Sequence, residues 1–192
     1  MRAHTHRDSH GCCSLRSAAM ASPLFEAVKA GDNKTALDLI RSGADVNARG
    51  TDGPAPADGG ATVLLAAIRN FDVTEEVVMA LLDKGADPNL ADTIEKETPL
   101  MATARTYPYK SPGDAIVKAL LKRGANAEQR NMYGDTALHV AASCGAALQC
   151  AVLIGLGADY KAKDAKKKTA EEIASDVATR SSIEEAVNLK TG

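Results

Sequence analysis

The stretch Gly43-Ala44-Asp45-Val46-Asn47 decides the fold, because the same phrase returns three times further along the chain. The later copies are Gly85-Ala86-Asp87-Pro88-Asn89, Gly124-Ala125-Asn126-Ala127 and Gly157-Ala158-Asp159-Tyr160. The leading glycines are 42, 39 and 33 residues apart. A period of about 20 to 50 residues is typical of stacked units rather than of one globular core. We take the shortest interval as the period, so the two longer ones contain insertions.

A second phrase, most complete as Thr136-Ala137-Leu138-His139-Val140-Ala141-Ala142, precedes each glycine phrase. Its copies begin at Ser22, Thr62, Thr98, Thr136 and Thr169. Ser or Thr caps a helix N-terminus and a proline such as Pro99 is tolerated in the first turn, so each copy predicts the start of a short helix.

Each unit also contains a second apolar-periodic helix that ends at the recurring glycine. Glycine supplies the left-handed residue that ends a helix, here Gly85, Gly124 and Gly157 among others. Two helix starts are marked, by Asp72 with Glu75 three residues later and by Ser111-Pro112-Gly113-Asp114.

On these two phrases the chain resembles the ankyrin-repeat family, over roughly residues 22 to 188. The resemblance implies an all-α solenoid of stacked helix-turn-helix units with projecting hairpin-like fingers. It also implies that His139 hydrogen-bonds the Thr136 hydroxyl and the backbone of a neighbouring turn. The motif residues are Thr62, Gly85, Thr98, Pro99, Gly124, Thr136, His139 and Gly157. We expect a disordered tail at residues 1–21, then five repeats, then a tail at 189–192. The repeats are 22–47, 48–90, 91–127, 128–160 and 161–188, and the first and the last repeat are caps.

Composition sets limits on function. The chain of 192 residues has a formal net charge of −2, and no apolar run is long enough for a transmembrane helix. The charge gives no general attraction to nucleic acid or to an anionic membrane. Four cysteines, two of them adjacent, do not make a disulfide framework, so a reducing cytoplasmic or nuclear setting is expected. We expect no cofactor, and a monomer when no partner is bound.

Residues 1–21 lie outside the repeat pattern. They contain three Arg, three His, Cys12-Cys13 and a single acid, Asp8. This composition is compatible with an organellar transit peptide, although a disordered tail is the favoured interpretation. His and Cys are zinc ligands, but their spacing here fits no common zinc pattern, so we expect no metal site. Translation beginning at Met20 would also explain the segment.

Two insertions break the period. The first, residues 50–60, is rich in Gly, Pro and Asp and is predicted to be a flexible loop, either a tolerated insertion or part of the binding rim. The second, residues 105–110, places Tyr107 and Tyr109 around a proline between Arg105 and Lys110. Tyrosine and arginine often carry binding energy. Packing of these tyrosines on their own repeat is an equally open alternative.

The family resemblance implies that a partner protein binds the concave face formed by the finger tips and the first helices. The variable tip residues are Arg49, then Asp92, Ile94, Glu95 and Lys96, then Arg130, Met132 and Tyr133, and finally Lys161, Lys163 and Lys166. The solvent-facing helix residues are Arg69 and Asn70, Arg105 and Thr106, and Ser143 and Cys144. We expect the third finger, with Arg130, Met132 and Tyr133, to be the main contact.

The fourth finger, residues 161–168, carries five Lys and one Asp. This charge favours a partner with an acidic segment near Lys161 to Lys168, with a solvated cap as the alternative. Nucleic acid is not expected, because a basic stripe with stacking aromatics is missing.

An enzyme is not predicted. His139 is the sole histidine within the repeats and occupies a structural motif position, so neither Cys144 nor Cys150 has a second histidine to activate it. Leu65 and Met101 replace the motif histidine in the second and third units. We therefore expect the middle of the stack to open more readily than the fourth unit. The sequence predicts a non-catalytic protein-binding scaffold or adaptor, with a regulatory or assembly-chaperone subunit as the alternative and an enzyme accessory subunit as a weaker one.

Overall fold

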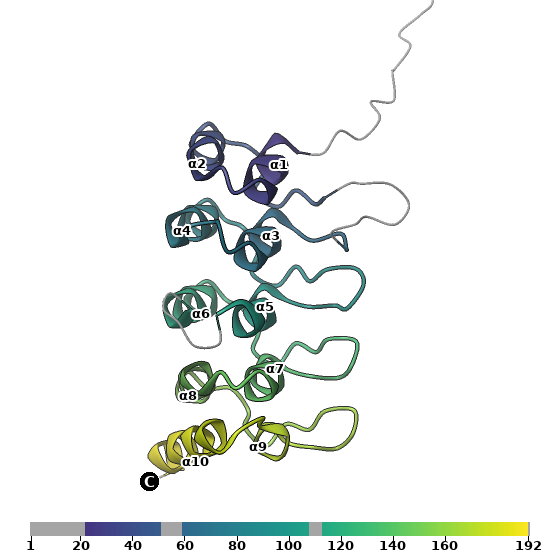
Figure 1. Ribbon diagram of the computed structural model, residues 1–192, viewed down its shortest axis with the longest axis vertical. Coiled ribbons are helices and arrows are strands. Elements are labelled where there is room, and N and C mark those ends of the chain that lie inside the picture. Colours follow the sequence, from purple (N-terminus) through teal and green to yellow (C-terminus); the bar gives the residue numbers. More distant parts are fainter. Residues whose placement is uncertain (1–21, 51–58, 108–112, 192) are drawn as a thin grey trace, which may run out of the picture.

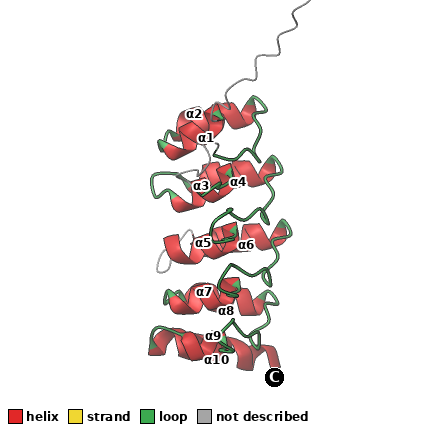
Figure 2. Ribbon diagram, turned by 90° about the vertical axis from the view of Figure 1, so that its right-hand side faces the viewer, coloured by secondary structure: helices red, strands yellow, loops and turns green. Residues whose placement is uncertain are grey.

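The computed structural model describes residues 22–50, 59–107 and 113–191, and these form five stacked pairs of antiparallel helices (Figure 1). The inner helices are α1 (Pro23–Lys29), α3 (Val63–Arg69), α5 (Pro99–Thr106), α7 (Ala137–Ser143) and α9 (Ala170–Ile173). The outer helices are α2 (Asn33–Arg41), α4 (Glu75–Asp83), α6 (Gly113–Lys122), α8 (Ala147–Gly155) and α10 (Val177–Thr191). The described residues contain helices and loops and one isolated β-bridge, between Arg49 and Thr62 (Figure 2).

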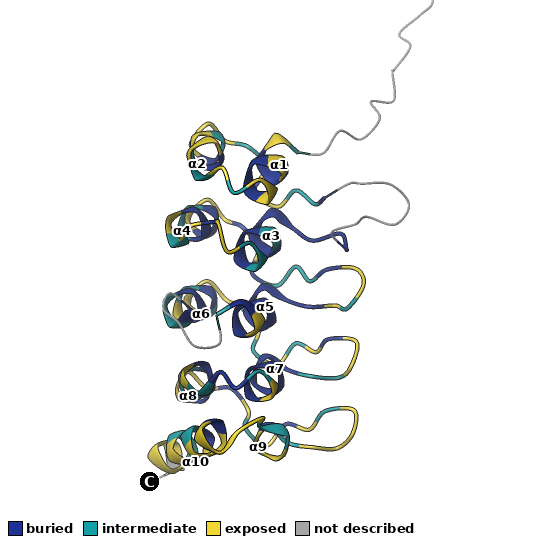
Figure 3. Ribbon diagram, in the orientation of Figure 1, coloured by how far each residue is buried: buried dark blue, intermediate teal, exposed yellow. Residues whose placement is uncertain are grey.

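The core runs through the stack, because each helix packs on its pair and on its equivalent in the next unit. Leu24, Leu64, Leu100 and Leu138 occupy the same place in successive inner helices and are buried. Figure 3 shows the buried residues on the helix sides that face neighbouring helices. Because no single unit encloses its apolar face, stability comes from contacts between neighbours.

Several of the predicted helix signals have the expected geometry, although Ser22 makes no side-chain capping hydrogen bond at the start of α1. Thr62 and Thr98 accept the backbone N–H of Leu65 and Met101, each at 3.3 Å. Gly43, Gly85, Gly124 and Gly157 have φ of 91°, 87°, 88° and 106°, the left-handed conformation that ends a helix. The prediction that Asp72 caps α4 is wrong, because Thr74 is the N-cap residue and its side chain makes no capping hydrogen bond. The start signal at Ser111-Pro112 lies outside the described residues.

His139 makes the two contacts that the family resemblance implied. Its Nδ1 lies 2.8 Å from the Thr136 hydroxyl oxygen, and its Nε2 lies 3.1 Å from the carbonyl oxygen of Lys168. Since a carbonyl only accepts, Nε2 carries the hydrogen and Nδ1 accepts from Thr136. The side chain therefore ties α7 to the finger of the next unit.

Asparagines at the base of the fingers connect successive units. Asn89 donates from Nδ2 to the Gly124 carbonyl at 3.0 Å and accepts the Asn126 N–H at 2.7 Å. Asn47 makes the same pair of contacts with Gly85 and Asp87. At the equivalent place in the third unit Glu128 accepts the Asp159 N–H at 2.9 Å. These bonds fix the spacing of the fingers along the stack.

Candidate functional site

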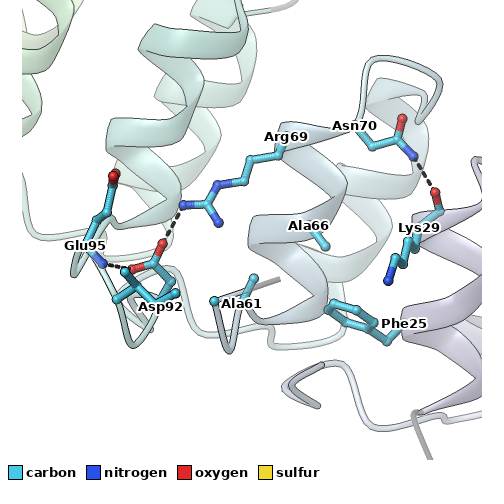
Figure 4. Close-up of a pocket in the computed structure, with 10 residues that line it drawn as sticks. Phe25, Lys29, Ala61, Ala66, Arg69, Asn70, Asp92 and Glu95 are labelled. Atoms are coloured by element: carbon cyan, nitrogen blue, oxygen red, sulfur yellow. Dashed lines mark hydrogen bonds and ion pairs between the residues drawn. The ribbon is translucent and has the colours of Figure 1, made fainter. Parts of the chain in front are cut away.

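The loops that precede α5, α7 and α9 project from one side of the stack and form a row (Figure 1). Beside this row lies a hollow of about 600 Å³ between the first two inner helices and the second finger (Figure 4). Its lining residues are Phe25, Lys29, Gly59, Ala61, Ala66, Arg69, Asn70, Asp92, Ile94 and Glu95. The hollow therefore has an apolar floor and charged walls.

A network of two acids and two arginines forms the boundary between the second and third units. Asp92 and Glu97 are buried, with about 4% of each side chain exposed. Arg69 Nη2 lies 2.6 Å from Asp92 Oδ2 and 2.5 Å from Glu97 Oε2, and Arg105 Nε lies 2.6 Å from Glu97 Oε1. Burial opposes the charge on Arg69, but its hydrogen bonds to Asp92 and Glu97 outweigh that effect and raise its pKa. The network holds both arginine side chains in place.

This network corrects the prediction for two residues. Asp92 was expected to be an exposed tip, but its carboxylate accepts the backbone N–H groups of Glu95 and Glu97 and shapes the turn from within. Thr106, the last residue of α5, was expected to face solvent, but it is buried. Arg69 and Arg105 do lie on the concave side, with side chains 34% and 49% exposed.

Large apolar side chains are exposed on the tips of two consecutive fingers. Ile94 is 61% exposed, Met132 58% and Tyr133 51%. The Met132 N–H donates to the Glu95 carbonyl at 2.8 Å, so the two tips touch through their backbones. Exposed apolar groups that gather in one place indicate a contact surface.

The two finger arginines that we expect to contact a partner also connect neighbouring fingers. Arg49 Nη1 donates to the carbonyls of Gly60 and Ala91 at 2.6 and 3.0 Å. Arg130 Nη1 donates to the carbonyls of Gly134 and Lys163, both at 2.6 Å. Both arginines lie six residues after the motif glycine, and each bridges to the equivalent residue of the next finger. Arg49 is half-buried and Arg130 is exposed, so their contact with a partner stays a prediction.

The other predicted contact residues differ in how far they are exposed to solvent. Glu95 is half-buried, and Lys96 and Ser143 are exposed, as are Lys161, Lys163 and Lys166 of the fourth finger. Cys144 is half-buried. The Asn70 amide is half-buried and donates to the Val28 and Lys29 carbonyls, so it also joins the first two units (Figure 4).

Tyr107 packs on its own repeat, which was one of the two alternatives for the second insertion. Its ring is partly buried against the core and makes an edge contact with Phe71, with ring centroids 6.3 Å apart. Burial, followed by the nearby charge of Glu75, raises the pKa of Tyr107. Tyr109, Lys110 and the leader with Cys12-Cys13 lie outside the described residues.

Sequence reasoning missed Glu97 and the hollow. One signal was available for the second finger: Gly85 and Thr98 are 13 residues apart, whereas Gly124 and Thr136, like Gly157 and Thr169, are 12 apart. The extra residue lies between Asp92 and Thr98. In this turn the Asp92 carboxylate accepts the backbone N–H groups three and five residues later. In the third finger the Asn131 side chain accepts those two and four residues later. The hollow depends on side-chain packing between units, which the repeat pattern does not describe.

Cys150 lies in α8 and is buried. Burial raises the pKa of the Cys150 thiol to about 12, which keeps it protonated at neutral pH. In residues 22–50, 59–107 and 113–191 no group of three or more His, Cys, Asp or Glu side chains could hold a metal ion. No helix among them is long and apolar enough to cross a membrane.

Comparison with known proteins agrees with this architecture. A family model described as ankyrin repeats in three copies matches residues 63–164, more than half of the chain. The chain belongs to the ankyrin-repeat family. It is 36% identical over 96 residues to human SH3 and multiple ankyrin repeat domains protein 1, a match that covers 50% of this chain and 4% of that protein. It is 32% identical over 127 residues to the E3 ubiquitin-protein ligase KEG of Arabidopsis thaliana, covering 65% of this chain and 7% of that protein.

The chain thus spans a small part of these relatives, and the likeness concerns the repeats. Ankyrin repeats are protein-interaction modules and are generally non-catalytic, and the repeat domain described here conforms to that architecture.

Proposed function

We propose that this chain is a non-catalytic scaffold or adaptor that binds a partner protein on its concave side. One observation carries the proposal: Ile94, Met132 and Tyr133 are exposed on adjacent finger tips, next to a hollow bounded by fixed charges. A few large apolar or aromatic side chains commonly supply most of the binding energy of a protein interface. Arg69 and Arg105 are held in place beforehand, so binding orders fewer side chains there.

We further propose that the partner carries an acidic segment that contacts the fourth finger. Lys161, Lys163, Lys166, Lys167 and Lys168 are all exposed. Complementary charge raises the rate of encounter and selects between partners.

Affinity capture with the tagged full chain tests the proposal. The variant Met132→Ala/Tyr133→Ala removes the apolar tip, and the control Phe71→Ala/Leu148→Ala removes comparably exposed side chains, 75% and 60% exposed, from the loop after α3 and from α8. We expect the tip variant to lose a partner that the wild type and the control variant retain. The captured protein is then purified and titrated against all three proteins. Equal affinity for the three would contradict the proposal.

A further inference from the structure

The third and fourth fingers are locked together and behave as one surface. Arg130 Nη1 lies 2.6 Å from both the Gly134 and the Lys163 carbonyl oxygens, one in each finger. A Cβ at Gly134 would come within 2.9 Å of the Ala165 backbone nitrogen, so the two turns are in close contact. The apolar tip of one finger and the lysines of the next therefore keep a fixed separation.

The fourth finger has a concentrated and uncompensated positive charge. Residues 161–168 carry +4 of a chain whose net charge is −2, so the remaining residues together carry −6. The single acid, Asp164, accepts the backbone N–H groups of Lys166 and Lys168, each at 2.8 Å, and these bonds lower its pKa. Within the described residues, Lys163, Lys166 and Lys167 form no ion pair.

The adjoining tip adds an apolar contact to this charge. Met132 and Tyr133 are 58% and 51% exposed, and methionine adapts to partner side chains of different shape. Lysine ammonium groups prefer carboxylates or phosphates as partners, whereas the tip prefers an aliphatic or aromatic side chain. A ligand that satisfies both must combine the two kinds of group.

We infer that the third and fourth fingers form one composite site for an extended acidic protein segment, in which a large apolar residue on Met132 and Tyr133 lies next to several carboxylates on Lys163, Lys166 and Lys167. This inference rests on the proposed function and specifies the partner at one end of the same face. Strands rise about 3.3 Å per residue, so a short extended stretch reaches across both tips.

A protein segment fits this surface better than an anionic membrane. The backbone contact between Met132 and Glu95 brings an acidic residue next to the apolar tip. That carboxylate would be repelled by anionic lipid headgroups at the depth where the tip would have to insert. A peptide can place a polar or basic residue opposite Glu95. Vesicles therefore serve as the second arm of the test.

The test is fluorescence anisotropy with a labelled peptide that contains one Phe, with Glu residues on one side of it to reach the lysines and Ser residues on the other side to lie near Glu95. A matched peptide replaces each Glu with Lys, and another replaces Phe with Ser. We expect the wild-type chain to bind the first peptide at least tenfold more tightly than either control peptide. We also expect the affinity to fall as salt rises through the physiological range, because the ion pairs are exposed.

Two charge variants locate the site. Lys163→Glu/Lys166→Glu/Lys167→Glu removes the positive finger, and Lys34→Glu/Lys84→Glu/Lys122→Glu changes net charge equally at exposed lysines elsewhere. The finger variant should weaken peptide binding at least tenfold, whereas the control variant should stay within about threefold of wild type. Met132→Ala/Tyr133→Ala should weaken binding without changing its salt dependence. Circular dichroism melts establish that each variant is folded.

Arg130 has a positioning role in this inference, and one variant separates that role from its charge. Arg130→Lys keeps the charge but replaces the planar guanidinium with an ammonium that cannot bridge both carbonyls in the same way. We expect weaker peptide binding with an unchanged salt dependence. A variant that binds as wild type does would remove Arg130 from the site.

Several results would overturn the inference. Equal loss in both charge variants would show attraction by net charge alone. Binding to phosphatidylserine vesicles without binding to the acidic peptide would assign the surface to a membrane. Failure of the peptide to bind, while the captured partner still requires Met132 and Tyr133, would refute the acidic segment and leave intact the proposal that a partner protein binds the finger tips. If the captured partner also binds Met132→Ala/Tyr133→Ala as tightly as the wild type, both this inference and the proposed function are wrong.

Discussion

The residue two places before each motif threonine has a left-handed backbone. Gly60, Lys96, Gly134 and Lys167 occupy this place with φ of 64°, 59°, 80° and 63°. Such a conformation costs a residue with a Cβ about 1–2 kcal/mol, whereas glycine adopts it freely. Two fingers therefore carry strain that the other two avoid.

We expect Lys96→Gly to stabilise the protein by about 0.5–1 kcal/mol, since relief of strain exceeds the greater entropy of glycine in the unfolded chain. Gly134→Ala should destabilise it by at least about 1 kcal/mol, because the new Cβ also meets the Ala165 nitrogen at 2.9 Å. Urea midpoints at constant m-value measure both changes. Lys96→Ala, which removes the same charge without relieving φ, is the control, and it should be no more stable than wild type.

Cys150 reports on opening of the stack. Burial raises the pKa of this thiol to about 12, so the thiol stays protonated at pH 8 in the folded protein. In a variant with Cys12, Cys13 and Cys144 changed to Ser, we expect a disulfide reagent to react slowly in native buffer and rapidly in urea. Reaction in native buffer at the rate of a free thiol would contradict the burial of Cys150.

The limits of sequence reasoning are clearest at the finger arginines. Residue type and position place Arg49 and Arg130 on the fingers, and that much is right. Their partners are backbone carbonyls of the next finger, such as Lys163 O, and a backbone group leaves no trace in the sequence. The hydrogen bond between Thr136 and His139 could be predicted, because the family motif contains both residues. Contacts encoded within one motif were predictable, whereas contacts between fingers were not.

Among the elements, the second finger departs most from the repeat. It contains the extra residue after Asp92 and the buried acids paired with Arg69 and Arg105. Buried carboxylates are costly when a cationic partner is removed, because the charge stays in a poorly solvated place. Arg69 contacts both acids, whereas Arg105 contacts Glu97 alone.

We expect Arg69→Met to destabilise the protein by about 3 kcal/mol. This value is at the lower end of the cost of breaking a buried ion pair, because a third of the Arg69 side chain is exposed. Arg105→Met, at a half-exposed side chain, should cost about 1 kcal/mol or less. Combining Arg69→Met with Asp92→Asn and Glu97→Gln should restore most of the loss. Additive effects in this cycle, measured by urea unfolding, would mean that the charges are not coupled.

At the scale of the whole molecule, the histidine contact distinguishes the fourth unit from its neighbours. His139 joins α7 to the Lys168 carbonyl, whereas Leu65 and Met101 fill the same place in α3 and α5 with buried apolar side chains. In a linear stack each unit is held by its neighbours, so a missing tie lowers the free energy of local opening. The second and third units also contain both period-breaking insertions.

Hydrogen exchange tests the resulting prediction. Amides of α3 to α6 should exchange faster than those of α7 and α8, and fastest at α3 and α5, where the finger tie is absent. His139→Leu should bring α7 down to the protection of α5 while leaving α1 and α2 unchanged, because coupling in a stack weakens with distance. Leu189→Ala, at an 88% exposed residue of α10, is the control and should alter no unit beyond its own. Uniform protection from α3 to α8 in the wild type would show that the buried network of Arg69, Asp92 and Glu97 compensates for the missing histidines.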